Sequence, residues 1–392
     1  MIHLRSRITS WILYSLTDCF HNFRSLKTRS TAQTRLENRV RDTKLDHLTK
    51  HYRKLQMILD IHDLMKHRKR GPFVSLQLMS RWKHMVGLNV AMGRFVHKYP
   101  HVFEVFVHPI KKNLCCRTTK GFRDLMNEES QVIKECMMET VTRLKKLLLM
   151  SKNRSLHVHA LSLIRRELGL PKDFRNSVLG TYKDHFRLVE DDIVELVDFD
   201  VVGQARVEEW REKEYTDKWL CESETRYAFP VSFPTGYKFE AGFREQLRNW
   251  QRIPYVKPYE GKGASRSSTP GGVKRLEKRV VGMMHEFLSL TVEKKMEVER
   301  FAHFKRDMGL DVNVRELLLK HPGIFYLSTK GKNPVVFLRD SYNRGCLIES
   351  NLIHSVRRKM LHSVLLGCRH TRNLQFEAAD TICQALSKEN IS

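Results

Sequence analysis

The sequence predicts an α+β fold that is mainly α-helical, and three observations predict it. First, one pattern of residues occurs three times along the 392-residue chain. Second, each copy joins segments with helical spacing of apolar residues to two short runs rich in aromatic and β-branched residues, which is typical of helices followed by a β-hairpin. Third, the long segments outside these copies also favour amphipathic helices. We therefore expect three related helix-helix-β-hairpin modules with insertions, which together form an elongated basic surface.

The third copy, at about 295–340, has the clearest signals. Apolar residues keep helical spacing over 313–320. Pro322 then ends this helix, because proline has no backbone N–H and restricts the residue before it. The runs 324–327 and 335–338 flank a turn-prone segment and therefore predict a hairpin.

Each copy is expected to begin with a further helix, at 76–85, 156–168 and 296–308. Gly309 suits the end of the last of these helices, since glycine readily adopts the left-handed conformation found after many helix C-termini. The predicted unit is thus two helices and a hairpin.

The first copy lies at about 73–118 and the second at about 154–198. Phe103 in the first copy takes the place of Phe325 in the third without a gap, whereas the second has one extra residue before its phenylalanine. One such unit cannot bury its own apolar face and needs neighbours. The alternative is a chance recurrence of glycine, proline and phenylalanine at helix-to-strand junctions.

Outside the copies, helices are predicted at 42–65, 128–150, 240–250 and 276–290. The run 260–272 is rich in glycine and serine and predicts a linker. It lacks the glycine spacing of a phosphate-binding P-loop, so no nucleotide site is expected there.

Net charge is the strongest guide to the partner. The chain carries 70 Lys and Arg against 44 Asp and Glu, a formal net charge of +26. The excess is uneven, since 190–224 holds thirteen acidic against four basic residues. A strongly basic protein attracts polyanions, nucleic acid before all others, and binds them more weakly as salt rises. The alternatives are an anionic membrane surface and a charge that serves solubility alone; no apolar run approaches the length of a membrane span.

The eight cysteines contain no Cys-x-x-Cys pair, so zinc-ribbon and thioredoxin-like sites lack their main signature. Scattered thiols fit a reducing compartment, where most are small buried apolar residues. Cys115 and Cys116 lie on a predicted hairpin without a recognisable nucleophile motif, which disfavours a cysteine hydrolase. We expect no catalytic residues, no metal and no other cofactor.

The N-terminal segment 1–36 has the composition of an organellar transit peptide. It contains six basic residues and one acid, Asp18, together with many serines and threonines. An apolar stripe that includes Leu4, Ile8 and Ile12 favours mitochondrial import, with the chloroplast as the alternative destination and a disordered basic tail as the alternative structure. At the other end, 369–392 is expected to be a flexible tail.

The candidate RNA-binding residues are chosen by charge. Single-stranded nucleic acid is bound by cations that meet phosphates and by aromatic rings that stack on bases, at about 1–3 kcal/mol per base. Trp82 between Arg81 and Lys83 fits that combination, with a place in the core as the alternative for its indole ring. The candidates are Lys66, Arg68, Lys69, Arg70, Arg81, Trp82, Lys83, Arg94, Lys111, Lys112, Arg117, Lys274, Arg275, Lys278, Arg279, Arg357, Arg358 and Lys359.

Blocks of sequence spread over almost all of 40–360 carry a resemblance to a known family. They lie at 41–42, 95–100, 145–151, 168–171, 186–189, 247–259, 277–291 and 321–328. In these blocks the chain resembles the plant organelle RNA recognition (PORR) domain family. The entry to the first copy is looser than the family pattern, and the second copy lacks its usual Lys-Tyr-Pro.

The resemblance implies an RNA-binding protein that is imported into a plant organelle and promotes splicing of group II introns. It implies organellar intron transcripts as partners, allows other splicing factors beside them, and implies no catalytic residues. An organellar ribosome-assembly factor or a protein-interaction adaptor is the alternative function. Because A-form RNA hides its major groove, such a protein should read loops, bulges and single strands.

Overall fold

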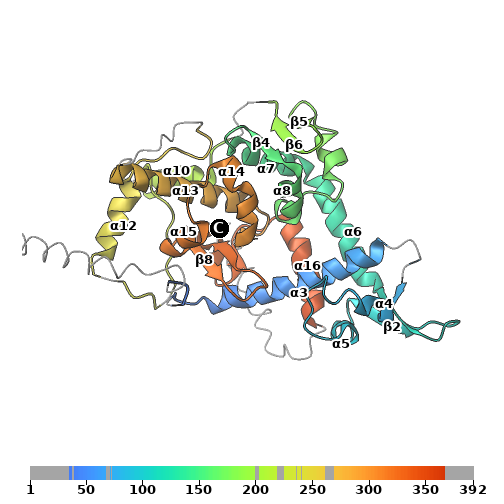
Figure 1. Ribbon diagram of the computed structural model, residues 1–392. Helices are drawn as coiled ribbons and strands as arrows, with labels where there is room; N and C mark the ends of the chain where they lie inside the picture. Colours follow the sequence, from blue (N-terminus) through green and yellow to red (C-terminus); the bar gives the residue numbers. More distant parts are fainter. Residues whose placement is uncertain are drawn as a thin grey trace, which may run out of the picture. The chain divides into compact units, whose positions relative to one another are not determined.

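The computed structural model describes residues 35–37, 39–67, 71, 73–198, 203–218, 225–234, 236–239, 241–260 and 269–366. The chain separates into two compact units, at 1–39 and 40–392, and all labelled elements in Figure 1 belong to the second unit. This unit is α+β and mainly helical, as the sequence predicts. Most of the predicted transit peptide and the whole predicted tail lie outside the described residues.

Three small antiparallel sheets share one strand order, in which the last strand of each segment lies between the other two. The three predicted hairpins are present as the pairs β2–β3, β5–β6 and β8–β9. The strands are β1 (Phe73–Ser75), β2 (Phe103–Val107), β3 (Leu114–Thr118), β4 (Ser155–His157), β5 (Phe186–Val189), β6 (Ile193–Leu196), β7 (Lys295–Glu297), β8 (Phe325–Ser328) and β9 (Val335–Leu338). A fourth sheet, of two strands, pairs β10 (Tyr342–Asn343) with β11 (Cys346–Leu347).

The first strand of each sheet corrects the prediction of an opening helix. A strand lies just before the first segment expected to be helical, at Phe73–Ser75. Strands also overlap the start of the other two segments, at Ser155–His157 and Lys295–Glu297. Helices begin only afterwards, as α4 (Leu76–Ser80), as α8 (Val158–Leu163) with α9 (Arg165–Leu168), and as the 3₁₀ helix η3 (Val298–Phe304) with α14 (Lys305–Met308). A strand of three residues is too short to show a period of two, so apolar spacing alone misses it.

Before each hairpin the chain turns through a left-handed glycine. Gly169 and Gly309 have φ of 76° and 64° and follow α9 and α14, so the predicted role of Gly309 is confirmed. A short helix comes next in each segment: α5 (Met92–His97), the π-helix η2 (Arg175–Leu179) or α15 (Val314–Lys320). Asn313 caps α15 by accepting a hydrogen bond from the backbone N–H of Glu316 at 3.3 Å.

Long helices surround these sheets. They are α3 (Thr43–Lys66), α6 (Lys120–Glu135), α7 (Met137–Leu149), α10 (Arg206–Lys218), α12 (Phe243–Arg252), α13 (Pro270–Leu290) and α16 (Leu352–Leu366). The helix predicted at 128–150 is in fact two, because the backbone at Cys136 has ψ of 21° and leaves helical geometry. The apolar spacing continues across this break, which hides it. The end of the predicted linker belongs to α13, since Thr269 caps that helix, and 261–268 lie outside the described residues.

α16 packs against both α3 and α6, which lie beside it in Figure 1. Apolar side chains from α3, the first sheet and α16 form one buried cluster. A buried ion network crosses the same region: Arg357 on α16 lies 2.7 Å from Glu129 on α6 and 3.6 Å from Glu293, which precedes β7. These contacts fix the relative positions of the elements that carry the clefts described next.

Candidate nucleic-acid interface

A groove of about 400 Å³ lies between α3, the segment 87–99 and the turn that joins β8 to β9. Its lining includes six cationic side chains and no carboxylate. None of the six forms an ion pair with a carboxylate in the described part of the chain. We call these six residues the basic groove: Lys50, Arg53, Lys54, Arg94, Lys98 and Lys330.

Helical spacing produces one side of the basic groove. Arg53 and Lys54 follow Lys50 by about one turn of α3, while Leu55 and Ile58 on another face of the helix are buried. α5 supplies Arg94 while burying Phe95, whose ring centroid lies 4.9 Å from that of Tyr99. The apolar anchors therefore hold the cations in fixed positions.

The electrostatic field near the groove is positive. His51 follows Lys50 on α3, and its pKa is lowered to about 4 by burial first and then by Lys54, His47 and Lys50. Cations held together without counter-charge repel one another, and a polyanion relieves that repulsion. Successive phosphates along a nucleic-acid strand provide such a ligand.

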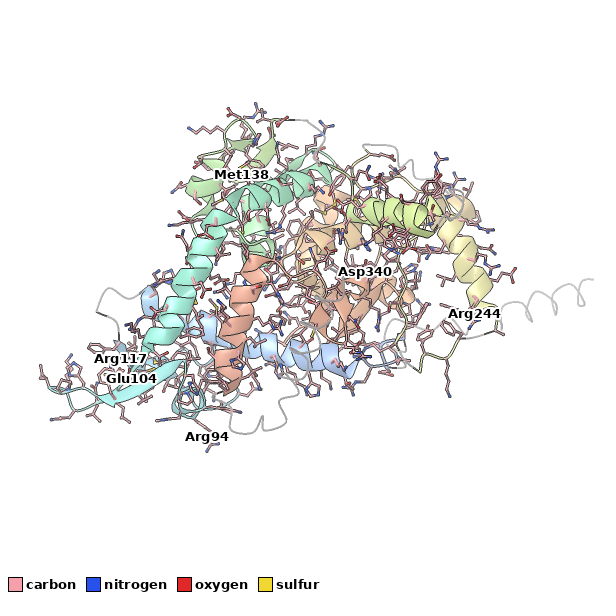
Figure 2. The ribbon with its side chains drawn as sticks, turned by 180° about the vertical axis from the view of Figure 1, so that it is seen from behind. Arg94, Glu104, Arg117, Met138, Arg244 and Asp340 are labelled. Carbon is pink, nitrogen blue, oxygen red and sulfur yellow. The ribbon has the colours of Figure 1, made fainter. Side chains whose placement is uncertain are left out.

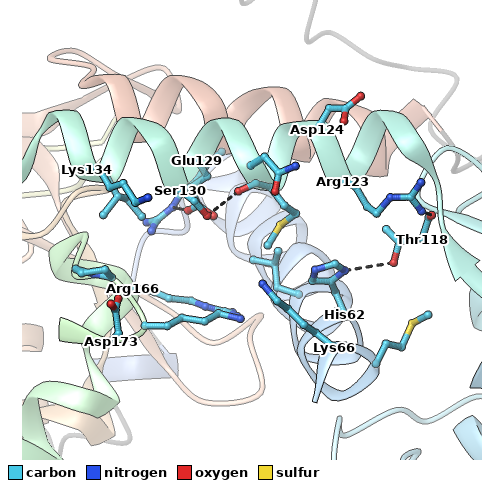
Figure 3. A pocket seen from close by; sticks show the side chains of 18 of the residues that line it. His62, Lys66, Thr118, Arg123, Asp124, Glu129, Ser130, Lys134, Arg166 and Asp173 are labelled. Carbon is cyan, nitrogen blue, oxygen red and sulfur yellow. Dashed lines mark hydrogen bonds and ion pairs between the residues drawn. The ribbon is translucent and has the colours of Figure 1, made fainter. Parts of the chain in front are cut away.

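A second, larger cleft of about 790 Å³ lies between α3, α6 and the segment 165–173. Figure 3 shows His62 and Lys66 on α3 and Arg166 from the 165–173 segment on opposite sides of this central cleft. The Nδ1 atom of His62 lies 3.2 Å from the hydroxyl of Thr118. The cations that line the central cleft are Lys66, Lys120, Arg123, Lys134, Arg165, Arg166, Lys172 and Arg357. The carboxylates that line it are Asp124, Glu129 and Asp173.

Three of the eight cations that line the central cleft, Arg166, Lys172 and Arg357, are paired with carboxylates. Arg166 lies 2.8 Å from Asp63, and Lys172 pairs with the same carboxylate. Burial would raise the pKa of Asp63, but these two cations lower it. The other five, Arg165 among them, form no ion pair with a carboxylate in the described ranges, and burial and the neighbouring Arg166 lower the pKa of Arg165. The central cleft is thus partly neutralised, whereas the basic groove is not.

Two candidate RNA-binding residues, Trp82 and Lys278, lie in the interior and not on the surface. Trp82 is 8 % exposed and packs in the cluster of α3, the first sheet and α16, so its ring cannot stack on a base. Lys278 is fully buried, and its Nζ donates to the backbone oxygens of Trp250, Gln251 and Ile253, each at 2.8 Å. It satisfies the carbonyls at the end of α12 and does not face solvent.

Arg357 is also buried, since it is 7 % exposed and paired with Glu129 and Glu293. Arg117 and Lys359 are exposed but paired. Arg117 lies 2.7 Å from Glu104 across the β2–β3 hairpin, where Figure 2 labels both, and Lys359 lies 2.6 Å from Glu128. Their charges are therefore partly compensated.

The structure brings one candidate, Arg94, into the basic groove and two, Lys66 and the buried Arg357, to the lining of the central cleft. The segment 68–70, with Arg68, Lys69 and Arg70, lies outside the described residues. The other candidates are elsewhere: Arg81, Lys111, Lys112, Lys274 and Arg275 are exposed, and Lys83, Arg279 and Arg358 are half-buried.

Five residues of the basic groove were not among the sequence candidates. Lys50, Arg53 and Lys54 carried a usable signal, namely three cations on the polar side of a predicted amphipathic helix. Lys98 and Lys330 carried none, because only the folded chain brings the turn before β9 next to α3.

The cysteine positions argue against a thiol nucleophile on the first hairpin. Cys115 and Cys116 on β3 are buried, and burial raises the pKa of Cys116 to about 12. A nucleophilic cysteine needs the opposite shift in its pKa.

In the described part of the chain, no helix combines the length and apolar character needed to cross a bilayer.

Comparison with known proteins points to one family. The chain is 35 % identical over 357 residues to ROOT PRIMORDIUM DEFECTIVE 1 of Arabidopsis thaliana, covering 88 % of this chain and 87 % of that protein. It is 29 % identical to the chloroplastic WHAT'S THIS FACTOR 1 homolog of Oryza sativa subsp. japonica, covering 82 % of this chain but 64 % of the relative. The mitochondrial WHAT'S THIS FACTOR 9 of Arabidopsis thaliana is also 29 % identical, over 74 % of each chain. No solved structure matches.

The family model of the plant organelle RNA recognition domain matches residues 40–369, which include every described residue of the second compact unit. The match includes both clefts and all three three-stranded sheets. The chain therefore belongs to the plant organelle RNA recognition domain family.

Proposed function

We propose that this protein binds intron RNA in a plant organelle and promotes group II intron splicing by stabilising the folded RNA, without catalytic residues of its own. The basic groove is the observation that carries the proposal: six cations converge and no carboxylate lines the site. Family membership supports RNA as the polyanion. The proposal that the RNA is a group II intron rests on the resemblance to the PORR family. Other splicing factors are further proposed partners.

We also propose that the segments 73–118, 154–198 and 295–340 are related modules and that their cations contribute to one basic surface. The shared strand order of the three sheets supports a common origin. A positive-φ glycine in each segment, at Gly87, Gly169 and Gly309, supports it further. The identical pairing order favours this proposal over the alternative of a chance recurrence of junction residues.

The proposed mechanism is electrostatic. RNA folding brings phosphates close together, and cations held on a rigid protein surface reduce their repulsion. The basic groove draws on α3, the first segment and the third segment, so one RNA strand bound there contacts distant parts of the chain at once. Such binding favours a compact RNA over an extended one.

A matched pair of lysines tests the role of the groove. Lys330 lines it, whereas Lys332 lies in the same turn and does not. We expect Lys330→Glu to weaken binding to intron RNA about tenfold at moderate salt and Lys332→Glu to have a much smaller effect, measured by fluorescence anisotropy. Equal losses for the two variants would contradict a localised groove.

Crosslinking followed by sequencing of bound RNA separates the candidate functions. Fewer intron reads for the Lys330→Glu variant than for wild type support splicing. A loss of spliced transcript in plants that carry this variant would confirm that the lost RNA binding impairs splicing. Ribosomal RNA reads support the assembly-factor alternative. An absence of RNA reads supports the protein-interaction adaptor and overturns the proposal.

We propose the mitochondrion as the location, from the composition of 1–36. Three of the relatives are named chloroplastic and one is named mitochondrial, so the chloroplast is the alternative. A fluorescent fusion to the first 40 residues, imaged in plant cells with markers for both organelles, decides between them.

A further inference from the structure

Four aromatic rings gather just before and at the start of α12. They belong to Phe233, Tyr237, Phe239 and Phe243, and every pair among them has ring centroids between 4.9 and 6.1 Å apart. We call these four residues the aromatic platform. It lies outside both the basic groove and the central cleft.

The platform is partly open to solvent. Phe239 is 42 % exposed, and none of the ten residues of α12 is buried. Figure 1 shows α12 at the left edge of the labelled fold, whereas the hairpin that contains β2 is at the right. Exposed aromatic surface is unfavourable in water, so a cluster of this kind indicates a binding surface.

One arginine lies against the exposed ring, and two further cations are close to it in the sequence. The guanidinium carbon of Arg244 lies 5.5 Å from the centroid of Phe239, and Lys238 and Arg248 are exposed nearby in the chain. Arg248 has no ion pair with any carboxylate in the described ranges. Glu245 on the same helix is also exposed, which leaves an excess of positive charge. Figure 2 shows the side chain of Arg244 at the surface of α12.

The platform is anchored at both ends. The backbone N–H of Ser232 donates to the carbonyl oxygen of Gly323 at 2.8 Å, and a Cβ at Gly323 would lie 2.9 Å from the ring of Phe233. Phe233 therefore needs glycine at that position to pack closely. At the far end, Lys278 binds the last carbonyls of α12. The segment that carries the rings is thus held by Ser232 and Phe233 before the platform and by Lys278 at the far end of α12.

We propose that the aromatic platform stacks unpaired RNA bases while Arg244 and Arg248 contact the flanking phosphates. The proposal rests on the proposed RNA binding and adds the class of RNA, namely a single-stranded segment. Aromatic rings beside arginines match such a ligand, because every base has a π-face and every linkage carries a negative charge. Bases inside a duplex do not expose those faces.

Abasic RNA provides the sharpest test, since it keeps the phosphates and removes the bases. The full-length protein is titrated with a single-stranded oligonucleotide and with the same oligonucleotide carrying consecutive abasic sites. We expect the abasic RNA to bind about tenfold more weakly. Equal affinity for the two RNAs would overturn the inference, whereas no binding of either at low salt would instead overturn the proposed function.

Two substitutions assign the effect to the platform. Phe239→Leu keeps apolar volume but removes the ring face, so it should weaken binding of intact RNA about tenfold and leave binding of abasic RNA unchanged. Phe239→Trp keeps a ring and should retain wild-type affinity. Circular dichroism confirms the fold of each variant. Unchanged affinity of Phe239→Leu for intact RNA, or an equal loss on both RNAs, would reject the platform as the site.

Discussion

Lys278 shows that a basic residue in a basic protein can serve the fold. In the sequence, Lys278 is close to Lys274, Arg275 and Arg279, and charge alone does not distinguish these four residues. In the structure, only Lys278 is buried, where its ammonium donates to three carbonyls and lies 4.8 Å from the ring centroid of Trp250. A cation so satisfied is retained for structure and not for RNA.

Lys278→Met should therefore destabilise the protein. Methionine keeps most of the volume but leaves three buried carbonyls unpaired, so the free energy of unfolding should fall by about 3 kcal/mol. Urea unfolding measures this change. Lys274→Met, on the exposed start of the same helix, should change stability by less than about 0.5 kcal/mol. Similar effects for the two variants would contradict this role for Lys278.

A comparison of Gly169 with Gly87 separates the energetic cost of backbone strain from the cost of a steric contact. Both have positive φ, 76° and 70°, but a Cβ at Gly169 would lie 2.9 Å from Ile353 Cδ1, whereas a Cβ at Gly87 would meet nothing within 4 Å. We expect Gly87→Ala to cost about 1 kcal/mol and Gly169→Ala about 2 kcal/mol. Thermal unfolding of both variants checks the difference, and equal costs would show that Ile353 moves away freely.

At the scale of elements, much of the fold could be predicted from local signals. The hairpins, α3 and the end of α14 at Gly309 each follow from runs of a few residues, such as Pro322 before β8. The strands β1, β4 and β7 do not, because each pairs with a strand roughly forty residues later, as Lys295 does with Phe337. The basic groove is hidden for the same reason, since Lys330 meets α3 only through tertiary packing.

The buried ion network that joins α6, α16 and the start of β7 should control acid stability. Glu293 is 7 % exposed and lies 2.8 Å from Lys295 and 3.6 Å from Arg357. Burial alone would raise the pKa of Glu293, but Lys295 and Arg357 lower it from 4.5 to about 2. Folding thus favours the ionised carboxylate, so its stabilisation is complete above pH 4.5 and is lost as the pH falls towards 2.

Glu293→Gln should remove this pH dependence. At pH 7 the variant should be less stable by about 3 kcal/mol, and the difference from wild type should shrink steadily below about pH 4.5. Urea unfolding at a series of pH values measures it. Glu245→Gln on the exposed face of α12 is the control and should match wild type throughout. A difference that stays constant with pH would contradict the assignment to Glu293.

For the whole molecule, the charge of +26 is less informative than its distribution. Part of the acidic segment forms α10, which packs against α13, and Arg211 on that helix turns inward to the hydroxyl of Tyr255 at 2.8 Å. The central cleft holds carboxylates among its cations, whereas the basic groove holds none. Binding of RNA should therefore depend on a few uncompensated positions more than on total charge.

A salt titration tests this distribution. Replacing Lys50, Arg53 and Lys54 by alanine should reduce the slope of log affinity against log salt by about 2, since each phosphate contact with a single strand contributes about 0.7. The control replaces the exposed Lys183, Lys213 and Lys305, which lie outside both clefts, and removes the same formal charge. Equal slopes for the two triple variants would show that total charge, and not the groove, governs binding.

The basic groove has a consequence for the order of events during synthesis. One wall comes from residues 50–54 and the other includes Lys330, so a ribosome must add some 280 residues after the first wall before the second exists. A chain that ends before the third sheet carries five of the six cations but lacks Lys330 and the turn that forms this wall. The complete groove therefore exists only when the polypeptide is nearly complete and has folded back on itself.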